Sequence, residues 1–262
     1  KANVYLELLY ERDADRWYDL YFNSLIEAKN FNEAEKLVKK RIRAKKHDAY
    51  LYVHLGKVYR LTDQQKKEQE AHEKALKELI PMQPHLQRLS QAFIAEELYS
   101  QALQVYEKAR RANPDYPFFY ERAEIFRMKG DIPAMIGEYL NAIELRESEL
   151  QSVQNHLQSN LGYDDQLGGI RNPVLKEELQ KRIAKNPGKT VLIEFLIYIQ
   201  KQQKDFSGAF VQSRALDKRL GESGHRVYEL ARICVENSDW ETAKRCYAYL
   251  LEKGPNSVYF DV

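Results

Sequence analysis

The chain has 262 residues, a length that fits one large domain or two small ones, and 44% of them are hydrophobic, which is enough to build a core. Its 41 basic and 39 acidic residues leave a net charge of +2, without the basic excess that is typical of a nucleic-acid binder, so no nucleic-acid partner is expected. Two cysteines exclude a disulfide scaffold and a cysteine-rich zinc module. No apolar run approaches the ~18 residues of a membrane span, so no transmembrane segment is predicted.

One pattern recurs along the chain: a small residue, an aromatic residue four positions later and a proline twelve positions later. It is seen in Ala102, Tyr106 and Pro114, and again at 243–255. The positions equivalent to Ala102 are Ala34, Glu68, Ala102, Met135, Leu175, Ala209 and Ala243. They are separated by steps of 34, 34, 33, 40, 34 and 34 residues. Apolar residues at helical spacing surround each position, which predicts one pair of helices for each period.

The repeated motifs resemble the tetratricopeptide repeat, a unit of two helices and about 34 residues. Tyr52, Leu55, Gly56 and Tyr59 match the first helix of such a unit, here called the A helix. Small residues such as Gly56 allow it to approach the second, or B, helix. The resemblance implies an all-α, right-handed superhelical solenoid of about seven helix pairs. Its A helices would line a concave groove, and stacking would bury the faces that a single pair leaves open.

The repeat register divides a single expected array, residues 1–262, into successive units. Their ranges are 15–48, 49–82, 83–115, 116–148, 149–189, 190–223 and 224–257. Residues 3–10 are expected to form the B helix of an upstream repeat, and the array is expected to be truncated at both ends. The unit at 149–189 is longer than the others, and its extra length lies in a loop at 160–173. That loop is interpreted as a tolerated connection, with a partner contact as the alternative.

Glu68 departs from the repeat pattern, because it occupies a position that is small or apolar in the other units. We expect this carboxylate to loosen the crossing of its helix pair. The tyrosines at repeat spacing are interpreted as core residues. Cys234 and Cys246 are predicted to be small buried thiols.

No signature of catalysis occurs in the sequence: HExxH, GxGxxG, GxSxG, the P-loop and CxxC are all missing. The six histidines are scattered, and none lies four positions from another histidine or a cysteine. We therefore expect a protein that is not an enzyme, with no cofactor and no metal site.

The tetratricopeptide resemblance implies that residues between the apolar positions of each A helix face a ligand. Arginine and amide groups there can bind peptide carbonyls and carboxylates, and tyrosine supplies rigid contact area. The predicted partner-binding residues are Asn23, His54, Lys57, Arg60, Arg88, Gln91, Tyr120, Glu121, Arg127, Tyr198, Tyr228 and Arg232. The carboxylate clamp of some family members is matched only by Asn23 and Arg88, and Asp19 stands where that clamp needs lysine. A receptor for chaperone tails is therefore disfavoured.

These features favour a scaffold or adaptor that binds a peptide or protein partner in a concave groove. One alternative is the non-catalytic regulatory array of a larger enzyme. Another is binding to an anionic surface through the basic helix at 36–46, which contains seven lysine or arginine residues. Stretches of the sequence are also similar to those of long tetratricopeptide proteins of bacterial cell envelopes, which organise assembly or secretion complexes. This similarity slightly favours the periplasm over the cytoplasm, and no oligomeric state is predicted.

Overall fold

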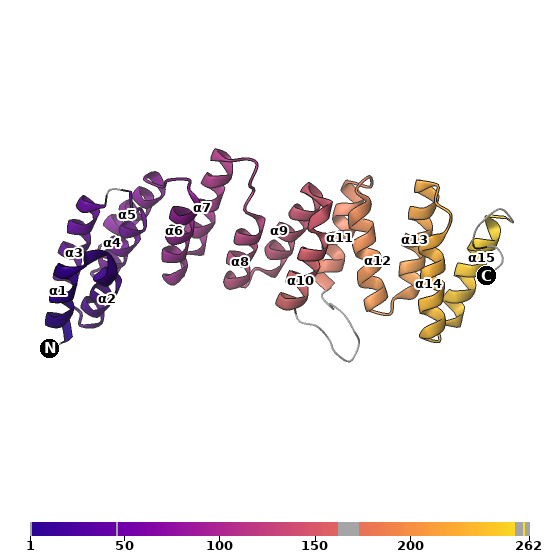
Figure 1. Cartoon of the computed structure of the whole chain (residues 1–262), viewed down its shortest axis with the longest axis horizontal. Helices are drawn as coiled ribbons and strands as arrows, with labels where there is room; N and C mark the ends of the chain where they lie inside the picture. The colour runs from indigo at the N-terminus through magenta and orange to yellow at the C-terminus, as the bar shows by residue number, and fades with distance from the viewer. Residues whose placement is uncertain (1, 46, 162–172, 255–258, 260–262) are drawn as a thin grey trace. The chain divides into compact units, whose positions relative to one another are not determined.

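The computed structural model describes residues 2–45, 47–161, 173–254 and 259, so the loop expected at 160–173 lies outside the described residues except at its ends. Every regular element within these ranges is a helix. Most successive helices are joined by short connections and run in opposite directions (Figure 1). The chain separates into two compact units, residues 1–125 and 126–262.

The first unit contains three complete helix pairs, preceded by one helix. The preceding helix, α1, covers the segment expected to be an upstream B helix. The bounds are α1 Ala2–Arg12, α2 Ala14–Glu27, α3 Phe31–Ala44, α4 Tyr50–Leu61, α5 Gln65–Lys77, α6 Gln83–Ala95 and α7 Tyr99–Ala112. Within this unit the A helices α4 and α6 pack against each other, and so do the B helices α5 and α7. Helix α8, Phe119–Lys129, begins in the first unit and ends in the second.

The second unit continues the alternation of A and B helices. Its elements are α9 Ile132–Leu145, the 3₁₀ turn η1 Glu147–Glu149, α10 Leu150–Leu161, α11 Pro173–Lys185, α12 Thr190–Gln202, α13 Phe206–Leu220, α14 His225–Glu236 and α15 Trp240–Glu252. Helix α12 packs on α13 and α14 packs on α15, while the B helices α13 and α15 are also in contact. The all-α fold of stacked helix pairs is therefore confirmed.

The same left-handed turn links the A helix to the B helix throughout the described residues. The residues with positive φ at this turn are Lys29, Asp63, Glu97, Gly130, Lys204 and Ser238. They repeat the spacing found in the sequence. The following N–H donates to the carbonyl five residues earlier, as from Gln64 to Tyr59 at 2.8 Å and from Asp239 to Cys234 at 2.9 Å. This Schellman arrangement satisfies the last carbonyls of the A helix, so the chain turns directly into the B helix.

The small and apolar residues at the repeat positions form the core. Ala34, Ala102, Met135, Leu175, Ala209 and Ala243 are all at most 3% exposed. Cys234 and Cys246 are buried free thiols, as predicted. Most tyrosines at repeat spacing, including Tyr18 and Tyr106, are also buried.

The crossing of α4 and α5 is close, although Glu68 was expected to loosen it. A Cβ atom at Gly56 would lie 2.7 Å from Cδ2 of His72, which is closer than real Cβ contacts. Gly56 is therefore the small residue that brings the two helices together. Glu68 lies instead beside a space between α5 and α7.

Every helix in the described ranges is too short or too polar to span a lipid bilayer.

Candidate functional site

Three A helices of the first unit line one groove with a volume of about 370 Å³. Helix α2 contributes Asp19, Phe22 and Asn23; α4 contributes Tyr50, His54 and Lys57; α6 contributes Arg88, Gln91, Ala92 and Ala95, followed by Glu96. Five of the residues predicted from the sequence therefore meet in this groove. They are Asn23, His54, Lys57, Arg88 and Gln91.

An aromatic cluster forms the floor of this groove. The ring of His54 stacks on Phe22 with centroids 4.5 Å apart, and Tyr50 meets it edge-on at 5.2 Å. Nδ1 of His54 lies 3.1 Å from the hydroxyl of Tyr18. Burial, aided by the nearby cations, lowers the pKa of His54 to about 3. His54 is therefore uncharged at neutral pH, and it serves as an aromatic surface and not as a cation.

Arg88 is held at the edge of the groove by its neighbours. Its guanidinium lies over the ring of Tyr50, 3.9 Å from the centroid, and Nη2 donates to the Tyr50 hydroxyl at 2.9 Å. The same nitrogen is 3.6 Å from Oδ2 of Asp19. Both members of this ion pair are at least half exposed, so the pair is weak and a ligand carboxylate can compete for Arg88.

Lys57 and Arg60 share one carboxylate, that of Glu96. Nζ of Lys57 donates to Oε1 of Glu96 at 2.7 Å, and Arg60 donates to Oε2. The side chain of Glu96 is only 9% exposed. The basic character that the sequence suggested for this groove is therefore largely neutralised from within.

Glu96 was not among the residues predicted from the sequence, although a signal was present. Glu96 follows Lys57 by 39 residues and Arg60 by 36 residues, slightly more than one repeat period. An acidic residue at the end of the next A helix is therefore within reach of two cations on the preceding A helix.

The carboxamides of Asn23 and Gln91 are exposed, and neither has a hydrogen-bond partner among the described residues. Each amide offers donors and an acceptor, the two kinds of group that a peptide backbone requires. The groove thus combines two free amides, an aromatic floor and one guanidinium, that of Arg88, whose carboxylate partner is exposed.

The residues predicted on α8 do not join this groove. Tyr120 and Glu121 belong to the first unit and Arg127 to the second. Glu121 accepts a hydrogen bond from the Tyr116 hydroxyl at 3.0 Å. A repeat register identifies which side chains share one side of a helix, but it does not make neighbouring A helices share a cavity.

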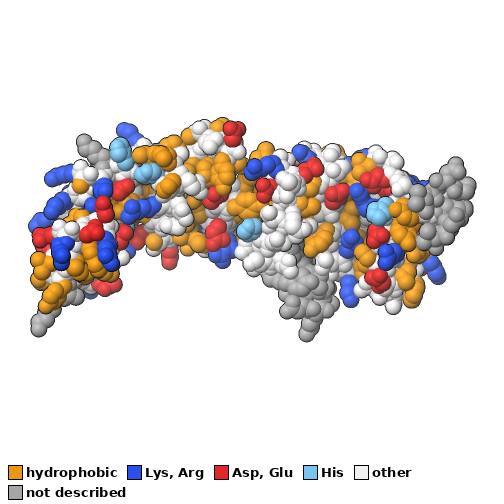
Figure 2. Space-filling model, viewed as in Figure 1, with side chains coloured by type: hydrophobic (Ala, Val, Ile, Leu, Met, Phe, Trp, Pro, Cys, Tyr) orange, Lys and Arg blue, Asp and Glu red, His pale blue; other side chains and the backbone are white. Residues whose placement is uncertain are grey.

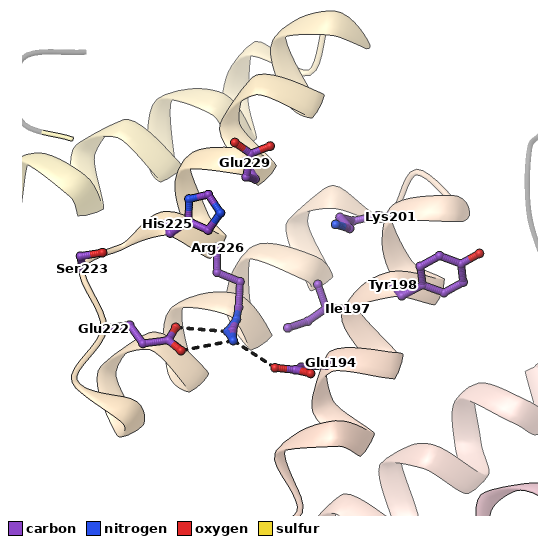
Figure 3. Close-up of a pocket in the computed structure, with 9 residues that line it drawn as sticks. All are labelled: Glu194, Ile197, Tyr198, Lys201, Glu222, Ser223, His225, Arg226 and Glu229. Carbon is purple, nitrogen blue, oxygen red and sulfur yellow. Dashed lines mark hydrogen bonds and ion pairs between the residues drawn. The ribbon is translucent and has the colours of Figure 1, made fainter. Parts of the chain in front are cut away.

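A second hollow lies between the A helices α12 and α14 of the second unit, with a volume of about 490 Å³ (Figure 3). Of the predicted residues, Tyr198 lines it. The other lining residues are Glu194, Ile197, Lys201, Glu222, Ser223, His225, Arg226 and Glu229. Arg226 donates to Glu222 at 3.1 and 3.3 Å and to Glu194 at 3.0 Å (Figure 3). This cation is thus fixed by two carboxylates.

Tyr228 and Arg232, which were also predicted, lie outside this lining. Tyr228 stacks on Tyr259 with centroids 4.8 Å apart, and Arg232 is 3.8 Å from Glu229. Glu222 and Ser223 were missed because they belong to the connection before α14, where the helical register does not apply.

Four of the seven basic residues at 36–46 pair with three neighbouring carboxylates. Lys36 pairs with a glutamate at 2.8 Å and Lys39 with another at 2.6 Å, while Arg41 and Lys45 both pair with Asp15. The Arg41 side chain is only 7% exposed, so it does not belong to a solvated face. Figure 2 shows basic and acidic side chains intermingled on the visible face of the first unit.

Within the described ranges, no group of three or more histidine, cysteine, aspartate or glutamate side chains could hold a metal ion.

No protein-family model and no curated protein matches this chain. Solved structures do match. The C-terminal part of a tetratricopeptide repeat-containing protein from Cytophaga hutchinsonii is 17% identical, with 92% of this chain and 97% of that chain covered and a TM-score of 0.31. A tetratricopeptide repeat protein from Parabacteroides merdae is 14% identical, with 98% and 96% covered and a TM-score of 0.30. YrrB, described as a tetratricopeptide protein with an unusual peptide-binding site, is 16% identical, with 85% and 95% covered and a TM-score of 0.25.

With TM-scores this low, the support for the fold lies in this chain's own helix pairs, in their shared left-handed turn and in the spacing of about 34 residues between those turns. On these features the chain is similar to tetratricopeptide repeat proteins.

Proposed function

We propose that this chain is a protein-interaction scaffold that binds an extended peptide segment of a partner in the groove of α2, α4 and α6. The observation that carries the proposal is the meeting of five predicted residues from three successive A helices in one groove. A groove built across several helices suits a ligand longer than a single side chain.

The chemistry of the groove indicates what such a segment contains. Asn23 and Gln91 can pair with backbone N–H and C=O groups. The aromatic floor around His54 offers an apolar surface to one side chain. Arg88 can exchange its exposed partner Asp19 for a carboxylate of the ligand. The expected ligand is therefore an extended peptide with an acidic residue beside an apolar one.

The anionic-surface alternative has less support. Four of the seven basic residues at 36–46 are already paired with carboxylates, which lowers the charge available to a lipid or an RNA. A regulatory array within a larger enzyme would use the same groove, so peptide-binding measurements test that alternative as well.

The test is selection of binders from a random displayed peptide library, followed by affinity measurements on two variants. Arg88→Ala removes the guanidinium of the groove. Arg111→Ala is the matched control, because Arg111 is on α7, its side chain is 76% exposed and it does not line the groove. Circular dichroism verifies that both variants are folded.

The selected peptides are expected to bind the unmodified chain and Arg111→Ala alike. They should bind Arg88→Ala about tenfold more weakly, a difference of ~1.4 kcal/mol. A selection without acidic binders, or equal affinity for the two variants, would contradict the proposed groove.

A further inference from the structure

The hollow between α12 and α14 belongs to the second unit and has a volume of about 490 Å³. Ile197 lies at its base, since this residue lines the hollow and is only 5% exposed. Figure 3 shows the Ile197 side chain pointing from α12 towards Arg226 of α14. The methylene stems of Arg226 and Lys201 add apolar surface to the same lining. An apolar base with a few polar groups around it is typical of a site that encloses part of a ligand.

Arg226 presents a guanidinium that is held in one orientation. Nη1 and Nη2 donate to the two carboxylate oxygens of Glu222 at 3.1 and 3.3 Å, and Nη2 also donates to Oε1 of Glu194 at 3.0 Å. These hydrogen bonds use the edge of the planar group and leave its faces for packing. Arg226 is therefore a flat and fixed surface beside Ile197 (Figure 3).

The connection that carries Glu222 is anchored to the core of the second unit. The N–H of Gly224 donates to Oδ1 of Asp217 at 2.8 Å, and Nζ of Lys253 donates to the carbonyl of Glu222 at 2.6 Å. The Asp217 side chain is 0% exposed and also accepts a hydrogen bond from the Tyr249 hydroxyl at 2.6 Å. This wall of the hollow is thus held in place by the protein itself, which reduces the cost of ordering it around a ligand.

The charges around the hollow disfavour a charged ligand. The carboxylates of Glu194, Glu222 and Glu229 line it and repel an anion, while Arg226 and Lys201 line it and repel a cation. An uncharged group meets neither penalty.

Lys201 adds a preference among uncharged groups. Its ammonium lines the hollow and has no ion-pair or hydrogen-bond partner among the described residues. The faces of an aromatic ring are negative, so they attract a lysine ammonium or an arginine guanidinium. The charge complementarity of this hollow is therefore with the face of an aromatic ring.

We propose that the hollow between α12 and α14 binds an aromatic side chain of a partner protein, with the indole of tryptophan preferred. The ring stacks on the guanidinium of Arg226, contacts Ile197 and attracts the ammonium of Lys201. Indole is preferred because it buries a large apolar area and is the best ring for a cation. An aliphatic side chain gains the contact with Ile197 but not the attraction to the two cations.

This site is independent of the groove that we propose for the acidic peptide segment. All its residues belong to the second unit, its occupant is uncharged, and its failure would leave the groove of α2, α4 and α6 untouched.

The test uses acetyl-tryptophan-amide as the probe and nuclear magnetic resonance of the whole chain as the readout. The reporters are the methyl groups of Ile197 and the Nε–H of Arg226. An indole stacked on them should shift both signals upfield and in a saturable way. The comparison probe is acetyl-cyclohexylalanine-amide, which is apolar and bulky but has no aromatic face, so it should bind more weakly. Absence of saturable shifts, or equal binding of the two probes, would overturn the proposal.

Two variants distinguish the guanidinium from the ammonium. Arg226→Lys keeps the charge but loses the flat surface, and it should bind the tryptophan probe about fivefold more weakly. Arg232→Lys is its control, because Arg232 is on the same helix, its side chain is 55% exposed and it does not line the hollow.

Lys201→Met removes the ammonium without touching the ion pairs of Arg226, and it should weaken binding by about threefold. Lys244→Met is its control, since Lys244 is exposed on α15 and outside the lining. Circular dichroism verifies folding of all four variants. Unchanged binding by both Arg226→Lys and Lys201→Met would show that the ring does not meet these cations. Arg88→Ala should leave the shifts unchanged, which separates this site from the groove of the first unit.

Discussion

The imidazole of His72 packs so closely against Gly56 that a methyl group at residue 56 would overlap the ring. Two effects therefore oppose each other in the Gly56→Ala variant. Alanine favours a helix interior over glycine by about 1 kcal/mol, whereas forcing an extra carbon into a packed crossing costs about 1–3 kcal/mol. We expect the steric cost to dominate and the free energy of unfolding to fall by about 1 kcal/mol in a urea titration.

Gly137→Ala is the matched control for that prediction. Gly137 also lies inside a helix, but its added Cβ would be 3.7 Å from the nearest atom, Nη2 of Arg182, which is an ordinary contact. This variant should gain about 0.5–1 kcal/mol. The prediction would be wrong if both glycine variants became more stable.

The left-handed turns offer a second test, because most of them lack glycine. Glu97 has a φ of 59°, a conformation that costs a residue with a Cβ about 1–2 kcal/mol. Part of this cost is offset by the greater freedom of glycine in the unfolded chain. Glu97→Gly should therefore raise the free energy of unfolding by about 0.5–1 kcal/mol. Glu70→Gly, made in the middle of α5, should lower it by a similar amount, and equal effects at the two positions would argue against strain at the turn.

The neutral state of His54 predicts a loss of stability in acid. The pKa of His54 is about 3 in the folded protein, below the usual histidine value of 6.5, so the unfolded chain binds the proton more readily. Stability is therefore fully present above pH 6.5 and falls as the pH decreases from 6.5 towards 3, by up to about 1.4 kcal/mol per pH unit.

The measurement is the slope of the unfolding free energy against pH between 6.5 and 5, above the range in which carboxylates titrate. His54→Gln should make this slope smaller, whatever the substitution does to the free energy of unfolding at pH 7. The exposed His47→Gln controls for the removal of a histidine. A slope that is the same in His54→Gln and in the unmodified chain would mean that His54 is not held neutral by burial.

The two thiols are expected to be inert in the folded protein. Burial raises the pKa of Cys234 to about 11 and that of Cys246 to about 12, and both side chains are 0% exposed. The thiolate is the reactive form, so a disulfide reagent at pH 8 should modify them only after guanidinium unfolds the chain. A thiol introduced by Ser100→Cys on the surface of α7 should react at once under the same native conditions. Rapid native modification of the unmodified chain would contradict the observed burial.

The sequence predicted the helix pairs well because the spacing of small residues follows directly from packing. Ala102 and Ala209 are fully buried at the positions where the register put them. The turns after the A helices were harder to recognise, because residues such as Lys204 and Ser238 adopt a left-handed conformation without the glycine that normally signals it. Their regular spacing becomes visible only in the backbone.

The candidate groove could be predicted in part. The register placed Asn23 and Gln91 on the same side of their helices, and both line the groove, since a helical period determines which side chains point the same way. It could not reveal that Lys57 and Arg60 are bound by Glu96, because ion pairs depend on rotamers and on the contact between successive A helices. The same limit explains why Arg226, fixed by Glu194 and Glu222, was missed.

The position of Glu96 has a consequence for how the affinity of the groove can change. An acidic group of a partner that approaches Lys57 has to compete with the carboxylate of Glu96, which the protein itself supplies to Lys57 and Arg60. Binding there would be an exchange of anions, in which an acidic segment gains only the difference between its own contacts and those of Glu96. Replacing Glu96 would free the side chains of Lys57 and Arg60 at the same time. A single substitution at Glu96 would therefore change the charge that the groove offers to every ligand.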